Sequence, residues 1–391
     1  VSIMGMFTKS RIEKLKDIST PFFYYDLEIL NQTLSAIKNE TAEHPFHVHY
    51  AIKANTNSAI LKRIKAFELG IDCVSGNEVK CALEHGFQAK KIAFAGVGKT
   101  DEEIKFGLEQ EIFTFNVESL PELEVIDEIA ASMNKIAPVA IRFNPNVNAK
   151  THHYITTGLE ENKFGINYWE IPQLIELFEK LKHVKLLGLH FHIGSQITDL
   201  SVFKNLCNRV NELQDLFREK SIHIGHINVG GGLGVNYQKP DEESVPDFKA
   251  FFDIFKQFLD LNPGQELHFE LGRSIVAQCS SLISKVLFIK KGIKTNFAII
   301  DAGMTELIRP ALYQSFHKIE NLTKAEQASA LKYDVVGPIC ESSDCFGKAV
   351  SLPETERGDL IAIRTTGAYG EVMASSYNLR EKAKAIYHEE I

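Results

Sequence analysis

Before residue 275, short β-type runs alternate with segments of helical periodicity, and this alternation leaves few folds open to the chain. The segments between most runs carry apolar residues at a 3.6-residue period, as in "SAILKRIKAFELG" and "IPQLIELFEKLKH". Eight strand-to-helix repeats predict an α/β fold, a TIM-type (β/α)8 barrel over residues 30–275. An open, doubly wound sheet is the alternative. The eight runs are "FHVHYAIK" (46–53), "GIDCVS" (70–75), "KIAFAG" (91–96), "IFTFNV" (112–117), "VAIRFN" (139–144), "KLLGLHFHIG" (185–194), "HINVGGG" (226–232) and "LHFELG" (267–272).

Most of these runs end in a side chain or backbone capable of chemistry, and this pattern favours the barrel. In a barrel the carboxyl ends of all strands meet at one mouth, where active sites lie. We therefore expect these positions to gather at one end of the barrel. They are Lys53, Ser75, Asn116, Arg142, His192, Gly230, Gly231, Gly232 and Glu270.

After about residue 276 the pattern changes to β-type runs separated by turns, such as "ALKYDVVGPIC" and "GDLIAIRTTGAYG". These runs predict a C-terminal all-β domain of sandwich or barrel type. The stretch "TPFFYYD" (20–26) is a further strand, which precedes the barrel in the chain and is expected to join that domain. We therefore predict a β domain formed by residues 1–29 and 276–391.

The composition of the 391 residues excludes several classes of protein. A formal net charge of −8 disfavours a nucleic-acid binder, which would concentrate Lys and Arg. No apolar run reaches the roughly 18 residues of a membrane span. The six cysteines lack disulfide or metal-site spacing, and the first residues lack the charge order of a secretory signal. We expect a cytoplasmic protein with reduced thiols and no membrane partner.

Lys53 is the last residue of the first barrel run, and two interpretations of it are open. A lysine at a strand end commonly extends its amine into solvent. In the partly dry mouth of a barrel, the amine would lose affinity for its proton and could form an imine with a carbonyl.

Three further motifs lie at strand ends. The glycines of "NVGGGLG" (228–234) could surround a phosphate or simply form a tight turn. His190 and His192 share a strand face, so a barrel metallohydrolase is the alternative from another class, although His192 could equally present its ring to an aromatic cofactor. In "FELGR", Glu270 could hold a proton on a heterocyclic nitrogen and Arg273 could bind a carboxylate, or the two could form a local ion pair.

The predicted β domain adds several polar side chains on expected loops. Cys340 and Glu341 are adjacent in one turn, and Arg309, Tyr313 and Tyr369 lie on other loops. Singly each is an ordinary surface or core residue. Together, Arg309, Tyr313 and Tyr369 form an excess of donors suited to an acidic, polar ligand.

Eight motifs in a fixed order resemble one family, the pyridoxal-phosphate decarboxylases of the alanine-racemase-like fold. Within it the chain resembles the branch that decarboxylates meso-2,6-diaminopimelate at its D-centre to L-lysine and CO2, the last step of lysine biosynthesis. The segment "RFNPNVNAKTHHYITTGLEENKFG" (142–165) is similar to the same branch, and carboxynorspermidine, ornithine or arginine are the alternative substrates. Leu271 departs from the proline usual in the family. The motifs are "YAIKAN", "VSGNE", "HFHIGSQ", "GGGLG", "ELGR", "DAGMTELIRPALY", "GPICESSD" and "GAYG".

The resemblance implies pyridoxal 5'-phosphate as cofactor, bonded to Lys53. It places His192 against the cofactor ring and Glu270 at the ring nitrogen, where a carboxylate favours the protonated form. The positions implied around the cofactor phosphate are Ser195, Gly230, Gly231, Gly232, Gly272, Arg273 and Tyr369.

The resemblance also implies how the substrate is held. Cys340 would return a proton to the α-carbon, and Glu341 would bind the distal ammonium group. Both would reach the site from the partner subunit, which implies a homodimer. No metal ligand is implied, and a non-catalytic relative is disfavoured because the chain keeps its lysine, carboxylate and thiol. The side chains implied at the distal carboxylate and elsewhere on the substrate are Arg273, Arg309, Tyr313 and Tyr369.

Overall fold

The computed structural model describes residues 5–145 and 163–391, and the chain divides into two compact units. The barrel unit comprises Leu34–Gly234 and Asp247–Gly272, and the β unit comprises Val1–Thr33, Val235–Pro246 and Arg273–Ile391. Most of the segment 142–165, which carried part of the resemblance, lies outside the described residues. No helix in the described ranges is long and apolar enough to cross a membrane.

Eight parallel strands close into a barrel, which confirms the predicted fold. The pairing of the first strand with the last completes the ring, with His49 opposite Glu270 in register. Around the barrel the strands are β2 (Phe46–Ala51), β3 (Gly70–Cys73), β4 (Ile92–Phe94), β5 (Thr114–Val117), β6 (Ala137–Arg142), β7 (Val184–His190), β8 (His226–Asn228) and β9 (Glu266–Leu271).

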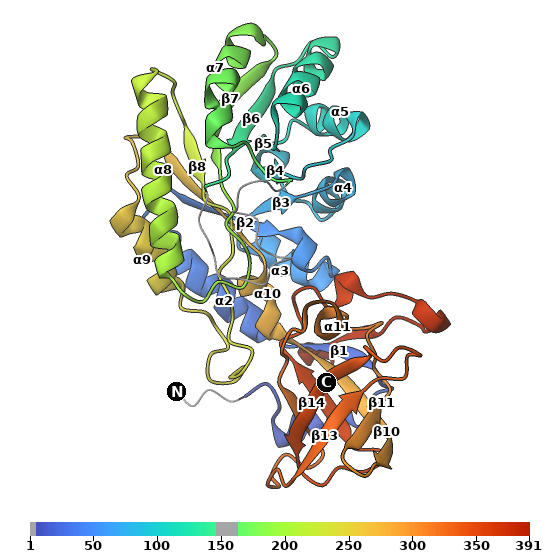
Figure 1. Cartoon of the computed structure of the whole chain (residues 1–391). Helices are drawn as coiled ribbons and strands as arrows, with labels where there is room; N and C mark the ends of the chain where they lie inside the picture. Colours follow the sequence, from blue (N-terminus) through green and yellow to red (C-terminus); the bar gives the residue numbers. More distant parts are fainter. Residues whose placement is uncertain (1–4, 146–162) are drawn as a thin grey trace. The chain divides into compact units, whose positions relative to one another are not determined.

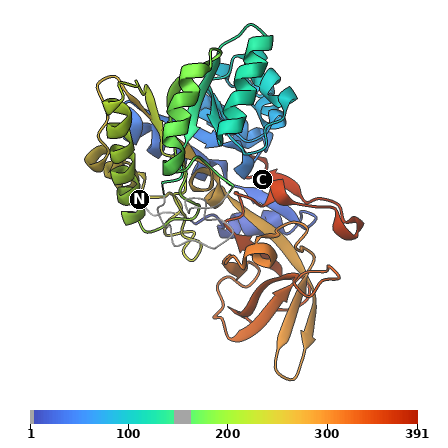
Figure 2. The same cartoon turned by 45° about the horizontal axis from the view of Figure 1, so that its top comes forward.

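Helices cover the outside of the barrel strands, as two views of the barrel unit show (Figure 1, Figure 2). The helix over residues 101–110 begins after Thr100, because the Thr100 side chain accepts from the N–H of Glu103 while the Glu103 carboxylate accepts from the N–H of Thr100. The helices are α2 (Leu27–Thr41), which begins in the β unit, and α3 (Ser58–Ala66), α4 (Gly76–Glu84), α5 (Asp101–Gln110), α6 (Leu120–Ser132), α7 (Ile171–Lys180), α8 (Ser201–Glu219) and α9 (Phe248–Phe258).

The packing of α9 on the barrel shows how the sequence pattern builds the core. Its phenylalanines recur at positions i, i+3, i+4 and i+7, from Phe248 to Phe255, and all four are buried. Three of them meet the ring of Phe269 on β9, with ring centroids 4.9 to 5.7 Å apart. Because side chains alternate along a strand, Phe269 faces the helix and its neighbours His268 and Glu270 face the barrel interior.

The β unit is built on one eight-stranded sheet, and the predicted strand at 20–26 joins it through antiparallel pairing of β1 with β10. Three short helices, α1 (Lys9–Leu15), α10 (Arg273–Val276) and α11 (Arg309–Tyr313), qualify the all-β prediction. The strands are β1 (Phe22–Tyr25), β10 (Ser280–Lys291), β11 (Asn296–Ile300), β12 (Ile319–Asn321), β13 (Leu331–Val336), β14 (Cys345–Leu352), β15 (Leu360–Arg364) and β16 (Lys384–Tyr387).

Candidate active site

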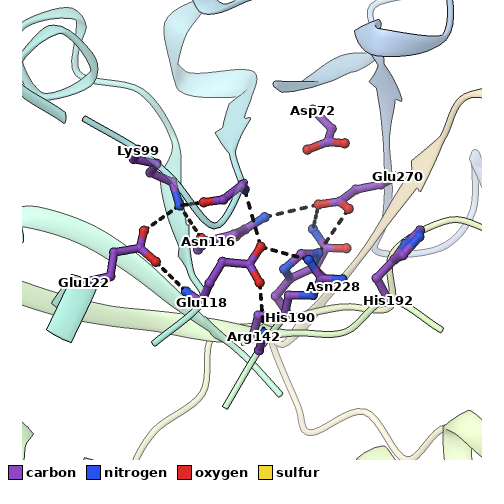
Figure 3. Close-up of polar contacts among 12 residues, drawn as sticks. Asp72, Lys99, Asn116, Glu118, Glu122, Arg142, His190, His192, Asn228 and Glu270 are labelled. Atoms are coloured by element: carbon purple, nitrogen blue, oxygen red, sulfur yellow. Dashed lines mark hydrogen bonds and ion pairs between the residues drawn. The ribbon is translucent and has the colours of Figure 1, made fainter. Parts of the chain in front are cut away.

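A buried carboxylate, Glu270, lies at the centre of a polar cluster inside the barrel (Figure 3). Its Oε1 accepts hydrogen bonds from Asn116 Nδ2 at 3.1 Å and from Asn228 Nδ2 at 2.9 Å, and its Oε2 lies 3.0 Å from His190 Nε2. The four side chains come from β5, β7, β8 and β9, and all are buried. Because an ionised carboxylate only accepts, His190 donates from Nε2.

This cluster keeps Glu270 ionised. Burial alone would raise the pKa of its carboxyl, but His190, and then the charge of Lys53, hold that pKa well below its ordinary value. An ionised carboxylate has about four acceptor positions. The described residues fill three of them, which leaves one for a further donor such as a protonated ring nitrogen.

His192 lies in the loop after β7, beside the glycine run. The N–H of Gly231 donates to His192 Nδ1 at 3.4 Å, and the N–H of Gly230 donates to Asn228 Oδ1 at 2.9 Å. Two of the three glycine amides therefore have partners within the protein. Burial, and then the charge of Arg142, lower the pKa of His192 well below its ordinary value, so its ring is neutral. Ser195 lies three residues further along the same loop.

Close backbone contacts require glycine in this run. A Cβ on Gly231 would lie 1.9 Å from the carbonyl oxygen of Glu270, and a Cβ on Gly230 would lie 2.3 Å from that of Phe191. Gly230 and Gly232 also have φ values of 70° and 103°, where side chains are unfavourable. Steric and conformational constraints alone are therefore sufficient to explain why residues 230–232 are glycines.

The substitution Gly231→Ala is expected to destabilise the protein by about 3 kcal/mol, because the new methyl group cannot fit without moving the backbone of β9. Urea unfolding of the variant would show this as a lower midpoint. Gly98→Ala is the matched control, because a Cβ at Gly98 meets nothing within 4 Å. Equal midpoints for the two variants would contradict the steric explanation.

Lys53 lies in a single 3-10 turn, η1 (Ile52–Ala54), which corrects the prediction that the strand runs through it. The strand ends at Ala51 because the N–H of Asn55 bonds back to the carbonyl of Ile52 at 3.1 Å. Asn57 then caps α3 by accepting from the N–H of Ala59. The two asparagines of "KANTN" therefore turn the chain from strand to helix, with Lys53 at the bend.

The amine of Lys53 is paired with a buried carboxyl on the neighbouring strand β3. Its Nζ lies 3.6 Å from Oδ2 of Asp72, which is 1% exposed. Burial, and then the charge of Glu270, raise the pKa of Asp72 well above its ordinary value, and the charge of Lys53 opposes this shift. The pair directs the lysine amine toward the same part of the barrel as Glu270.

A second network supports the ends of β5 and β6 (Figure 3). Arg142 Nη1 lies 2.8 Å from Glu118 Oε1, and both side chains are buried. Lys99 Nζ donates to the carbonyl of Asn116 at 2.8 Å and pairs with Glu122 at 2.5 Å. Lys99 therefore fixes the backbone of the asparagine that donates to Glu270.

In the β unit, tyrosine rings surround two buried arginines. Arg273 begins α10 and donates from Nη1 to the hydroxyl of Tyr237 at 2.6 Å, and its guanidinium lies 5.1 Å from the ring centre of Tyr369. The guanidinium of Arg309, on α11, lies 5.6 Å and 5.9 Å from the ring centres of Tyr237 and Tyr313. Tyr237 therefore contacts both arginines, each of which is 6% exposed.

Arg309 has only neutral hydrogen-bond partners among the described residues. Its Nε donates to His317 Nε2 at 3.4 Å and its Nη2 donates to Ser315 Oγ at 3.2 Å. His317 is neutral, because burial and then the charge of Arg309 lower its pKa to about 3. Burial and the nearby charge of Arg273 also lower the pKa of Arg309. A buried guanidinium without a carboxylate partner is suited to an incoming anion.

Cys340 and Glu341 are exposed in the turn between β13 and β14. Asn378 Nδ2 donates to the Cys340 sulfur at 3.3 Å, and the hydroxyl of Tyr377 donates to Glu341 Oε1 at 2.7 Å. The hydrogen bond to Glu341, and then the contact with Cys340, raise the pKa of Tyr377 to about 12. The thiol and the carboxylate are therefore held at the surface by two neighbouring residues.

Sequence reasoning missed two residues of these clusters and did not predict the role of a third. Tyr237 lies in Val235–Pro246, a short excursion of the chain from the barrel unit into the β unit, and no motif marks it. No motif in the sequence marks His317 either. His190 was considered as a possible metal ligand, whereas it donates directly to Glu270.

Comparisons with known proteins place the chain in a family. Residues 27–277 match the family model "Pyridoxal-dependent decarboxylase, pyridoxal binding domain". The chain is 58% identical over 381 residues to a diaminopimelate decarboxylase of Bacteroides thetaiotaomicron, covering 97% of this chain and 98% of the relative. A second relative, the diaminopimelate decarboxylase of Vibrio cholerae, is 41% identical, with 94% of this chain and 87% of the relative covered.

A solved structure shows the same fold over nearly the whole of both chains. The crystal structure of diaminopimelate decarboxylase from Helicobacter pylori complexed with L-lysine superposes with a TM-score of 0.90 and 39% identity. The match covers 97% of this chain and 94% of that one. The chain therefore belongs to the pyridoxal-dependent decarboxylases, and within them to the diaminopimelate decarboxylase family.

Proposed function

We propose that this chain decarboxylates meso-2,6-diaminopimelate at its D-centre to L-lysine and CO2. The choice of substrate depends on one observation, the environment of Arg309. This arginine is buried and has only neutral hydrogen-bond partners in the described part of the chain, and the nearby charge of Arg273 lowers its pKa. Two buried guanidinium groups in this cluster favour a ligand with a second carboxylate. The diaminopimelate skeleton has one, whereas ornithine, arginine and carboxynorspermidine do not.

The barrel cluster fits pyridoxal phosphate, the cofactor of this family. When bound, this cofactor supplies a sink for the electrons left when the carboxylate departs. Glu270 is ionised and has one acceptor position left, so it can hold a proton on the ring nitrogen. Lys53 presents an amine for bonding to the aldehyde, and the neutral ring of His192 can lie against the cofactor ring. The phosphate would lie near Ser195, Gly230, Gly231, Gly232, Gly272, Arg273 and Tyr369.

The roles proposed for the β unit follow from its polar clusters. Arg273, Arg309 and Tyr313 bind the distal carboxylate. Glu341 binds the distal ammonium group, and Cys340 returns a proton to the α-carbon from which CO2 has left. Since both are exposed on their own chain, we propose that they act in the site of the partner subunit of a homodimer. In this proposal the β domain, residues 1–29 and 276–391, completes the active site.

The state of the cysteines supports a cytoplasmic location. All six, which lie within the described residues, are free thiols. Proteins that reside in oxidising compartments commonly pair such residues in disulfides.

The test is decarboxylation by the chain reconstituted with pyridoxal phosphate. We expect lysine and CO2 from meso-diaminopimelate, with kcat/KM for ornithine and arginine lower by roughly 10⁴-fold, because these substrates bring no second carboxylate to Arg309. Lysine would be measured by chromatography and CO2 by a coupled assay. Comparable turnover of ornithine would contradict the role of the arginines, and no turnover of any amino acid would contradict the function.

A further inference from the structure

A histidine cluster lies at the amino-terminal end of the barrel strands, away from Lys53 and the glycine loop. His47 and His49 lie on β2, and Glu266 and His268 lie on β9. The two strands pair in register, with His47 opposite His268. Because side chains alternate along a strand, both histidines of β2 share one face, and Glu266 and His268 share the inner face with Glu270. The rings of His47 and His268 are 4.8 Å apart.

A chain of hydrogen bonds fixes which nitrogens carry protons. His49 Nδ1 lies 3.2 Å from the carbonyl oxygen of Lys91, which can only accept, so Nδ1 is protonated. His49 is 3% exposed, and burial favours the neutral ring, so its Nε2 is an acceptor. That Nε2 lies 2.8 Å from His268 Nδ1, which must therefore donate.

This arrangement leaves the lone pair of His268 Nε2 facing a carboxylate. Nε2 lies 3.3 Å from Glu266 Oε2, and the other oxygen of Glu266 lies 3.5 Å from His47 Nε2. His268 is 4% exposed, so a second proton on its ring would place a charge in a buried position. Two acceptors that face each other repel unless a proton or a metal cation lies between them.

We propose that His47, Glu266 and His268 bind a divalent transition-metal ion, with Zn²⁺ as the best match. Their ligand atoms all lie within 4.8 Å of one another. Two neutral imidazoles and one carboxylate are a ligand set that zinc takes with a fourth position open to water. His49 accepts the other N–H of His268, and thereby fills the place that a carboxylate, a backbone carbonyl or water takes beside most metal-bound histidines.

The surroundings give the ion both a fixed ligand and an entry path. Phe113 stacks on His268 with ring centroids 5.2 Å apart and planes within 6°, which fixes the ring of the buried ligand. A cavity of about 340 Å³ is lined by all three proposed ligands. The side chains of His47 and Glu266 are 50% and 49% exposed, so they can move to close on the ion.

The experiment uses the metal alone as probe. Holoenzyme freed of metal with a chelator would be titrated with Zn²⁺ by calorimetry and with Co²⁺ by absorption spectroscopy. His47→Ala and Glu266→Gln are the test variants, since both positions are half exposed and tolerate substitution. His44→Ala is the matched control, because His44 is exposed, close in sequence and outside the cluster.

We expect one Zn²⁺ per chain for the wild type and for His44→Ala, and affinity reduced more than about tenfold in each test variant. Bound Co²⁺ should lack the intense near-ultraviolet band of thiolate ligation, which separates this site from the six free cysteines. No saturable binding, unchanged affinity in both test variants, or a thiolate band would each overturn the proposal. None of these readouts depends on the proposed reaction.

Discussion

Replacement of Lys53 by alanine is expected to abolish decarboxylation, lowering kcat by on the order of 10⁴-fold or more, as losses of a covalently acting group do. The lysine amine lies on the bend after β2, paired with Asp72 at 3.6 Å, and no other lysine in the described part of the chain pairs with that carboxyl. The variant has no amine at this bend to bond to the cofactor aldehyde. Its solutions should therefore lack the visible absorbance of the lysine-bound cofactor.

Borohydride reduction gives a direct readout of the bond to Lys53. In the wild type, reduction should fix the cofactor on the peptide that contains Lys53, as peptide mass spectrometry would show. Lys62→Ala is the matched control, since Lys62 is exposed on the next helix, α3. Activity and colour should survive in the control. If Lys53→Ala kept the absorbance, or if the label appeared on another lysine, the assignment would be wrong.

The barrel was predictable because its signals are local. Strands and helices differ in the spacing of their apolar residues, so eight strand-to-helix repeats could be counted without knowing which strands are neighbours in the fold. The helix start at Thr100 and the turn at Asn55 and Asn57 also depend on residues a few positions apart. The local signals did misplace the end of the first barrel strand. The run of strand-type residues continues to Lys53, whereas the backbone already turns into η1 after Ala51.

The contacts that were not predictable join residues far apart in the chain. His49 and His268 meet only because β2 and β9 close the barrel, 219 residues apart. Glu270 was identified from its motif, but its donors Asn116, His190 and Asn228 come from three other strands, and only the barrel geometry brings them together. Such partners need the register of the strands, which a single sequence does not contain.

The short excursion of the chain at Val235–Pro246 hid the contacts of Arg309 in the same way. Tyr237 lies in a segment that the periodicity assigns to the barrel, yet it belongs to the β unit and contacts both buried arginines. His317 follows Arg309 by eight residues, a spacing with no regular meaning at the end of a five-residue helix. The arginines were therefore predictable from their motifs, and the side chains that orient them were not.

Replacement of Cys340 by alanine is expected to leave the cofactor bound and the solution coloured, while lowering kcat by roughly 10²–10⁴-fold, the usual contribution of a positioned acid. The thiol is exposed and is held by Asn378 at 3.3 Å, so its loss should not affect the core. Cys345→Ala, five residues along and half-buried, is the matched thiol control. Turnover near that of the wild type would contradict the role of Cys340 as proton donor.

Mixing the two inactive variants tests whether Cys340 acts across subunits. Lys53→Ala and Cys340→Ala chains that are expressed together form a mixed dimer. If the thiol of each site comes from the partner subunit, one site of this dimer carries both substitutions and the other site carries neither. Random pairing makes half of the dimers mixed, so activity should return to roughly a quarter of the wild type in a two-fold symmetric dimer. If each site used its own thiol, every site in the mixture would lack one group and activity would stay absent. Purification of the mixed dimer with two different affinity tags should raise the recovered activity to roughly half, because each such dimer then holds one intact site of two.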